Sequence, residues 1–154
     1  VKSHFADSVV IDANVFVKLL HAEHDSPLAF DFLDYCIAHD ILIVAPTLFD
    51  YEVISVCVRL HIELNEILAL LADYRATNLV LQVPDFDDWQ LASKICQDGN
   101  AKSGYPSMYD SIYQAMAINR NITFVSADTR HIAKANKHGN VCALAEWRDI
   151  FNHF

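Results

Sequence analysis

The chain has 154 residues, of which 53% are hydrophobic and 20% are charged, a composition that excludes intrinsic disorder and collagen-like structure. Its apolar runs end after a few residues, far short of the about 18 that a membrane-spanning helix needs, and no signal-peptide pattern precedes Val10. We therefore expect a cytoplasmic protein with no membrane association, and its net charge of −9 argues against a general nucleic-acid coat protein.

Taken in chain order, unbroken apolar and β-branched runs predict strands at 9–12, 41–45, 79–83, 122–126 and 141–144. Apolar residues at helical spacing predict helices after Asp12 and over 26–40, 48–61, 64–75, 87–99, 108–119 and 129–137. Ser26, Thr47 and Ser107 are expected to cap three of these helices. Alternating strands and helices predict an α/β fold in three layers, a parallel sheet of four to five strands flanked by helices, within one domain over 1–154.

Several common catalytic motifs are missing from the sequence. The four cysteines are widely spaced and form no Cys-x-x-Cys pair, which predicts free thiols in the core. The three glycines cannot build a dinucleotide-binding or phosphate-binding loop, and no Gly-x-Ser-x-Gly elbow is present. Dinucleotide-dependent, P-loop and α/β-hydrolase chemistry are therefore disfavoured.

Charge is unevenly distributed along the chain. Residues 101–140 hold five basic and two acidic residues, whereas the remainder holds six basic and eighteen acidic residues. Arg130, Lys134, Lys137 and His138 recur at helical spacing, so they can form one basic face beside Asp128. Such a face can hold a phosphate backbone, although a solvated helix surface explains the same pattern.

Two aspartates follow predicted strands at their carboxyl ends, where ligands gather in open α/β sheets. Asp12 ends the first strand, and Asp128 lies just beyond the strand at 122–126. Taken singly, each is also explained as a turn or helix-capping residue.

Two further acids lie on apolar helices. The helix over 48–60 is apolar on nearly all sides, so we expect it to be largely buried and Glu52 to need a partner, either Arg59 or a metal ion. Asp110 lies among apolar and small residues in the first turn of its helix, where it can also complement the helix dipole. Converging on one site, the four acids would repel one another unless protonated or bound to Mg²⁺ or Mn²⁺, ions that suit phosphodiester hydrolysis.

The sequence resembles the PIN-domain ribonuclease family over nearly its whole length. The resemblance rests on four blocks in the family's order and spacing: Val9–Asn14, Glu52, Tyr109–Ala115 and Phe124–Asp128. It implies single-stranded RNA cleavage with Asp12, Glu52, Asp110 and Asp128 as catalytic Mg²⁺ or Mn²⁺ ligands, and Asn14 and Ser126 as hydrogen-bonding supports. In VapC-like toxin members it further implies a homodimer and an antitoxin partner. Arg130 replaces an aspartate found in many toxin members, which leaves the number of metal ions open.

Two other functions compete with the nuclease. A PIN-fold module could bind RNA or a protein partner without cutting, which the net charge and Arg130 would suit. A small-molecule phosphatase would need an Asp-x-Asp nucleophile motif, and Asp12-Ala13-Asn14 lacks its second acid. The apolar helix over 48–60 could also extend into a dimer face.

Overall fold

The computed structural model describes residues 7–151, and these residues build one parallel β-sheet. Its strands are β1 (Ser8–Ile11), β2 (Leu42–Pro46), β3 (Leu79–Gln82), β4 (Thr123–Ser126) and β5 (Val141–Ala143). They lie in the order β3-β2-β1-β4-β5, with every pairing parallel. At the centre, Val10 of β1 pairs with Val44 of β2 and Phe124 of β4. The predicted parallel α/β fold is confirmed.

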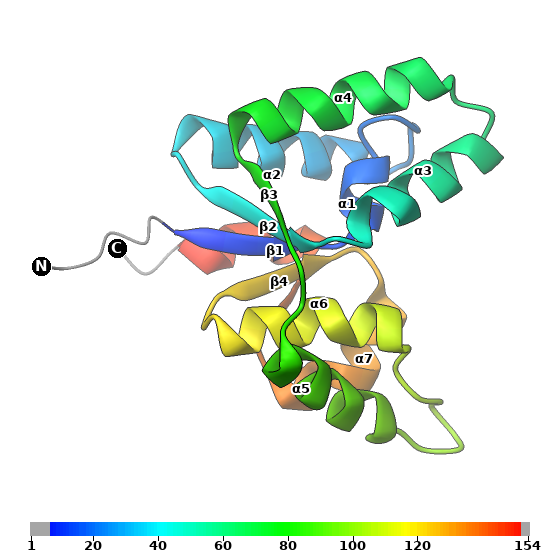
Figure 1. The fold of residues 1–154 in the computed structure, drawn as a ribbon, viewed down its shortest axis with the longest axis vertical. Coiled ribbons are helices and arrows are strands. Elements are labelled where there is room, and N and C mark those ends of the chain that lie inside the picture. The colour runs from blue at the N-terminus through cyan, green and yellow to red at the C-terminus, as the bar shows by residue number, and fades with distance from the viewer. Residues whose placement is uncertain (1–6, 152–154) are drawn as a thin grey trace, which may run out of the picture.

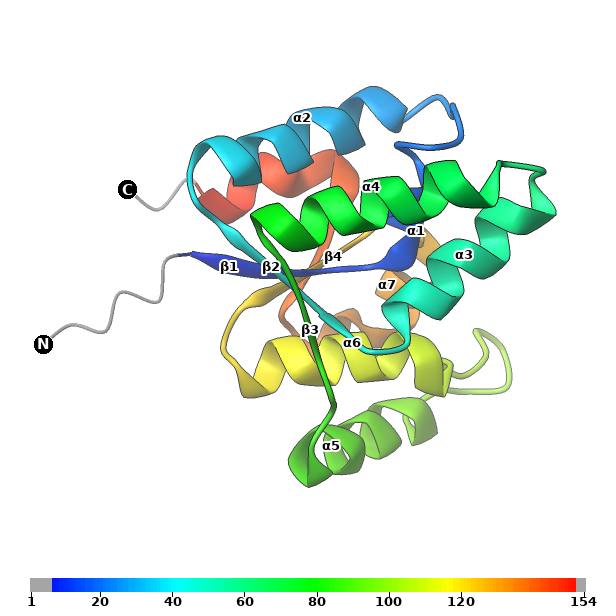
Figure 2. The same cartoon turned by 45° about the horizontal axis from the view of Figure 1, so that its top comes forward.

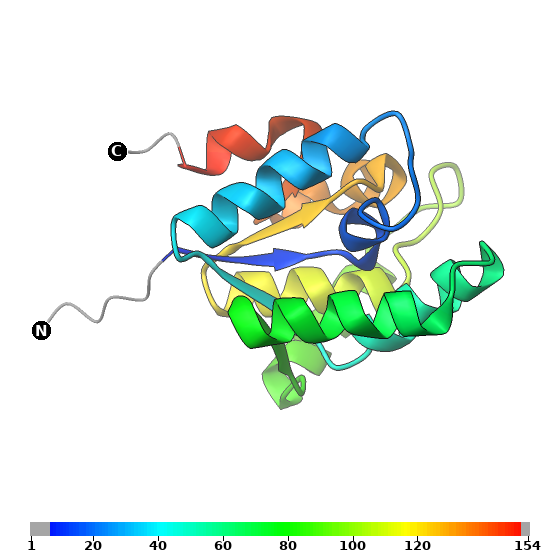
Figure 3. The same cartoon turned by 90° about the horizontal axis from the view of Figure 1, so that it is seen from above.

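Helices cover both faces of this sheet. They are α1 (Ala13–Val17), α2 (Ser26–Ala38), α3 (Phe49–Arg59), α4 (Leu64–Thr77), α5 (Phe86–Gln97), α6 (Met108–Asn119), α7 (Thr129–Ala135) and the 3₁₀ segments η1 (Asn136–His138) and η2 (Leu144–Phe151). Figures 1 and 2 show α2 and α4 on one side of the sheet and α5 and α6 on the other. Figure 3 shows η2, in red, alongside α2. Within residues 7–151, no helix is long and apolar enough to cross a membrane.

The core lies between the sheet and these two helical layers. Val9, Val10 and Ile11 are buried because β1 is covered on both faces, which explains its unbroken apolar sequence. Helix α6 packs beneath β1, β2 and β4 and buries Tyr113 and Met116. This packing brings the first turn of α6 to the carboxyl ends of the central strands.

Helix starts differ from the sequence prediction at two places. Asp25, instead of Ser26, occupies the N-cap position of α2, and its side chain makes no capping bond. The Ser26 hydroxyl accepts a hydrogen bond from the backbone N–H of Glu23 at 2.8 Å. Thr47 does not cap α3, because Leu48 occupies the N-cap position of that helix. The backbone N–H of Thr47 bonds to the carbonyl of Gln82 and continues the β2–β3 pairing. Ser107 caps α6 as predicted, accepting from the backbone N–H of Asp110 at 3.0 Å.

Helix α3 is less buried than its composition suggested. Of its side chains only Phe49, Val53 and Cys57 are fully buried, whereas Tyr51 is 79% exposed. The helix packs mainly on α1 and α4 instead of lying under the sheet, so only one face is covered. The expectation of a largely buried helix was wrong. Apolar residues on all sides of a helix do not determine how many neighbouring elements pack against it.

All four cysteines are free, as predicted, but only two belong to the core. Cys36 and Cys57 are buried, whereas Cys96 and Cys142 are partly exposed. Burial raises the pKa of the Cys36 thiol to about 12. This thiol therefore packs as a small apolar group.

Candidate metal centre at the carboxyl ends of the strands

Asp12 is held at the end of the central strand with its carboxylate inside the protein. Its backbone N–H donates to the carbonyl of Val125 at 3.0 Å, and its residue is only 3% exposed. It occupies the N-cap position of α1, yet its side chain makes no capping bond. The capping explanation for this residue therefore fails, and its carboxylate is available for another role.

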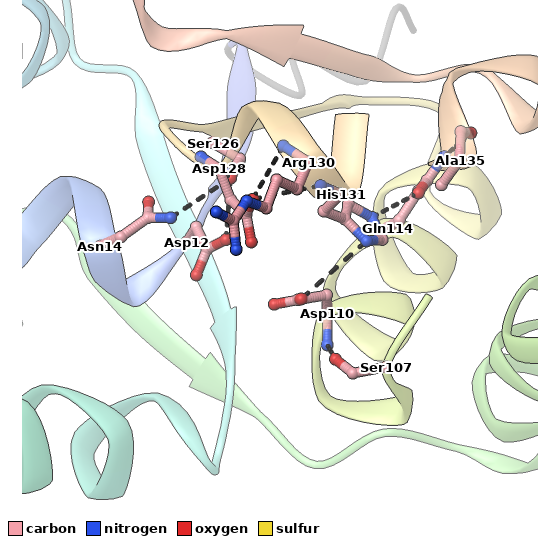
Figure 4. A network of polar contacts seen from close by, with 10 residues as sticks. All are labelled: Asp12, Asn14, Ser107, Asp110, Gln114, Ser126, Asp128, Arg130, His131 and Ala135. Atoms are coloured by element: carbon pink, nitrogen blue, oxygen red, sulfur yellow. Dashed lines mark hydrogen bonds and ion pairs between the residues drawn. The ribbon is translucent and has the colours of Figure 1, made fainter. Parts of the chain in front are cut away.

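Ser126 and Asn14 hold that carboxylate in place (Figure 4). The Ser126 hydroxyl donates to Asp12 Oδ2 at 2.9 Å and accepts from the backbone N–H of Asp128 at 3.0 Å. Asn14 Nδ2 approaches the same hydroxyl at 3.5 Å, and Asn14 Oδ1 accepts from the backbone N–H of Ala127 at 3.2 Å. These bonds connect the ends of β1 and β4.

Asp128 lies next to Asp12 in this network and also caps α7. Its Oδ1 accepts from the backbone N–H groups of Arg130 at 3.0 Å and His131 at 3.1 Å. The capping explanation holds for this residue. One carboxylate oxygen is thus committed to the start of the helix.

Glu52 is partnered by a tyrosine instead of Arg59, one of the two partners that the sequence suggested. The hydroxyl of buried Tyr113 donates to Glu52 Oε1 at 3.1 Å. Glu52 and Arg59 form no ion pair in residues 7–151, because seven residues of helix separate them by about 10 Å. The Tyr113 bond joins α3 to α6 at the end of the sheet.

Three of the four acids interact electrostatically. Burial, followed by the nearby charges of Asp110 and Glu52, raises the pKa of Asp12 to about 7 despite the hydrogen bond from Ser126. Burial also raises the pKa of Glu52 to about 7, with Asp110 adding to the shift and Tyr113 opposing it. Figure 4 shows the carboxylates of Asp12 and Asp110 directed toward the same region. A cation between these groups would relieve their repulsion.

The chemistry of these donors fits a hard divalent cation. Within residues 7–151, no three His, Cys, Asp or Glu side chains lie close enough to hold a metal ion as they stand. Mg²⁺ does not require three, because it usually keeps several waters and binds through one or two carboxylates. Asp12, Glu52 and Asp110 fit that requirement best, since burial and the nearby charge of Asp110 raise the pKa values of Asp12 and Glu52 and no cationic partner offsets either shift.

The basic residues near the acids do not form one continuous face. Helix α7 ends at Ala135, so Lys137 and His138 lie on the following 3₁₀ turn. Both bind Asp98, through Nζ at 2.8 Å and Nε2 at 2.9 Å. The expectation of a single helical face was wrong because the helix is shorter than predicted. Arg130 is exposed and Lys134 is half-buried.

His131 is a member of this region that the sequence did not single out. Its residue is 2% exposed, and its Nδ1 lies 4.0 Å from Asp110 Oδ2. Burial lowers its pKa, although the nearby Asp110 and Asp128 oppose the shift. No sequence signal marks this residue, because its inward orientation is set by the packing of α7.

Comparison with known proteins agrees with this fold. The chain matches the PIN domain family over residues 9–137. No curated protein sequence matches it significantly. Solved structures share the fold at low identity. VapC20 of Mycobacterium tuberculosis, described as a sarcin-ricin loop cleaving toxin, has a TM-score of 0.63 and 12% identity, with 81% of this chain and 94% of that chain covered.

The other two structures cover even more of this chain. FitAB bound to a DNA fragment has a TM-score of 0.62 and 17% identity, with 90% of this chain and 95% of that chain covered. A PilT N-terminus domain protein from Sulfolobus solfataricus has a TM-score of 0.51 and 17% identity, with 96% of each chain covered. Because the family match spans most of the sequence and includes all four acids, the chain belongs to the PIN domain family.

Proposed function

We propose that this chain is a divalent-cation-dependent endoribonuclease that hydrolyses phosphodiester bonds in single-stranded RNA. The observation that carries the proposal is the placement of Asp12 and Glu52 near Asp110 at the carboxyl ends of the strands, where burial and then the nearby negative charge raise two carboxyl pKa values to about 7. The PIN domain family is a family of nucleases, which supports the same activity. We place the activity in one PIN-like domain over residues 1–154.

Mg²⁺ or Mn²⁺, when bound, would supply Lewis-acid polarisation of the phosphate and a lowered pKa for the attacking water. Asp12, Glu52 and Asp110 would hold the ion, and Asp128 would contribute through the carboxylate oxygen that does not cap α7. Ser126 fixes the orientation of Asp12, and Tyr113 fixes that of Glu52. Water oxygen would bond to phosphorus as the bond to the 3′ oxygen breaks and that oxygen takes a proton. The products would be a 5′-phosphate and a 3′-hydroxyl.

Basic side chains beside the acids would hold the RNA backbone. Arg130 is exposed two residues after Asp128, which makes it the strongest phosphate-binding candidate. Lys134 and Lys137 remain candidates, although the ion pair with Asp98 must open before Lys137 can bind phosphate.

A toxin role, with an antitoxin partner and a homodimer, follows by analogy with VapC20 and FitAB. Exposed apolar side chains on α3 and α4, including Tyr51, Val58 and Leu64, offer a surface for the second copy. The buried thiols of Cys36 and Cys57 suit the reducing cytoplasm, where we place the protein.

The test is cleavage of a mixed-sequence single-stranded RNA by the purified protein in Mg²⁺, in Mn²⁺ and in EDTA. We expect cleavage that requires a divalent ion and is lost in Asp110→Asn. This substitution removes the one carboxylate whose charge acts on both Asp12 and Glu52. Asp87→Asn, an exposed acid on α5, serves as the matched control and should cleave normally. Equal cleavage by wild type and Asp110→Asn would place the activity elsewhere or in a contaminant.

A module that binds RNA or a protein without cutting is the second candidate. It is favoured by Arg130 beside the acids and by the lack of three converged ligands in the described part of the chain. RNA binding without cleavage in either metal would support this function over the nuclease.

A further inference from the structure

His131 has one ring nitrogen satisfied and one left without a partner inside the protein. Gln114 Nε2 donates to the carbonyls of Ala135 at 2.9 Å and Gly139 at 3.0 Å, which fixes the orientation of its amide. Gln114 Oε1 must therefore accept, and His131 Nε2 lies 2.9 Å from it. This nitrogen must carry the ring proton. In the neutral ring, Nδ1 is then an unprotonated acceptor.

That unprotonated nitrogen faces the acidic cluster. Nδ1 is buried and has no hydrogen-bond partner, and it lies 4.0 Å from Asp110 Oδ2 (Figure 4). Two electron-rich atoms therefore oppose each other across a gap too long for a hydrogen bond. Metal–oxygen and metal–nitrogen bonds are about 2.0 to 2.1 Å long, so two donors to one ion lie at most about 4.2 Å apart. The gap can thus be spanned by a single cation.

We propose that His131 Nδ1 is a nitrogen ligand of the metal ion, paired with Asp110 across this gap. The inference rests on the proposed metal-dependent function and adds a residue to its site. Buried histidines that bind metals usually have the other ring nitrogen fixed by a hydrogen bond, which is what Gln114 provides. The carbonyls of Ala135 and Gly139 anchor Gln114 in turn, so the fixed ring orientation depends on the end of α7.

A nitrogen ligand changes which ion the site prefers. Carboxylate oxygens suit Mg²⁺ and Mn²⁺ alike, whereas imidazole favours transition metals over Mg²⁺. The site should therefore bind Mn²⁺ more tightly than Mg²⁺. In His131→Gln this preference should shrink, and Mn²⁺ affinity should fall by about 10- to 100-fold.

Pulsed electron paramagnetic resonance of the Mn²⁺-loaded wild-type protein tests the contact directly. We expect modulation from a directly bound ¹⁴N nucleus, and incorporation of ¹⁵N-histidine should change it to the ¹⁵N pattern. The wild-type measurement requires no substitution, so it does not depend on whether a variant folds. The histidine is assigned with His131→Gln, which should lose the modulation, and with His138→Gln, which should keep it because His138 binds Asp98 on the surface.

Calorimetric titration with Mn²⁺ and Mg²⁺ separates the two ways in which the inference could fail. Mn²⁺ bound in an Asp110-dependent manner without nitrogen modulation would overturn the role of His131 and leave the metal centre intact. Failure to bind either ion would overturn both the ligand assignment and the metal dependence in the proposed function. Equal Mn²⁺ affinity in folded His131→Gln, judged by its metal-free thermal unfolding, would also contradict the inference.

Discussion

Asp12→Asn should lower RNA cleavage by about 100-fold or more while making the metal-free protein more stable. The loss is expected because an amide cannot supply the negative charge that holds the cation. The gain is expected because the ionised Asp12 carboxylate is 3% exposed and lies near Asp110 and Glu52, which raises its pKa to about 7. Asparagine removes that charge and can still accept the Ser126 hydrogen bond. We expect about 1 to 3 kcal/mol of added stability at pH 8.

The stability gain should depend on pH in a defined window. The folded chain holds the Asp12 proton more tightly than the unfolded chain, whose carboxyl pKa is near 3.8. The ionised group therefore costs no stability below about pH 4, and the cost grows until about pH 7. Burial lowers the pKa of His131, so the contribution of this residue to folding stability rises with pH, opposite to that of Asp12, in wild type and variant alike. The difference between wild type and Asp12→Asn isolates the contribution of Asp12.

Urea unfolding in EDTA at pH 5, 6, 7 and 8 measures this difference. Asp34→Asn, an exposed acid on α2, is the control and should change neither stability nor cleavage. A difference that stays flat from pH 5 to 8, or an Asp12→Asn protein less stable than wild type at pH 8, would contradict the proposed repulsion among the acids.

Arg120→Met should destabilise the fold by about 3 to 5 kcal/mol, because it leaves a buried charge without its partner. Asp88 is fully buried and accepts from Arg120 through both oxygens, at 2.9 and 3.0 Å. Burial alone would raise the pKa of Asp88, but the bonds from Arg120 and Asn119 outweigh it and lower the pKa. Arg120 also donates to Gln82 Oε1 at 2.8 Å, so it ties α5 and α6 to the end of β3.

Chemical unfolding of Arg120→Met, alone and combined with Asp88→Asn, measures this effect. The double variant should recover part of the loss, because Asp88→Asn removes the unpaired buried charge. Lys137→Ala breaks an exposed pair with Asp98 and should leave the unfolding midpoint unchanged. A double variant less stable than Arg120→Met would show that hydrogen bonding, and not buried charge, dominates at this position.

The sequence was sufficient to predict the sheet and the location of the acids. Asp12 and Asp128 could be placed because the carboxyl ends of parallel strands lie at one edge of a sheet, whatever the details of packing. Ser107 could be assigned as a cap because its hydrogen bond with the backbone of Asp110 is local in sequence.

Features that depend on tertiary packing could not be predicted in the same way. The partner of Glu52 is Tyr113, 61 residues away, and Asp88 and Arg120 are 32 residues apart. No local pattern encodes either contact. Similarly, the apolar sequence of α3 does not reveal that the helix contacts neighbours on one side only. His131 was missed because a single histidine among basic residues gives no sign of facing inward.

The most direct measurement of the metal centre is an anomalous difference map from crystals soaked in Mn²⁺. We expect a peak within ligating distance of Asp110 and of Asp12 or Glu52, at the carboxyl ends of β1 and β4. The same crystals of Asp110→Asn should lose it. A peak only at the Asp98 and His138 pair, or no peak near Asp12 and Asp110, would contradict the assignment of this acidic cluster as a cation site.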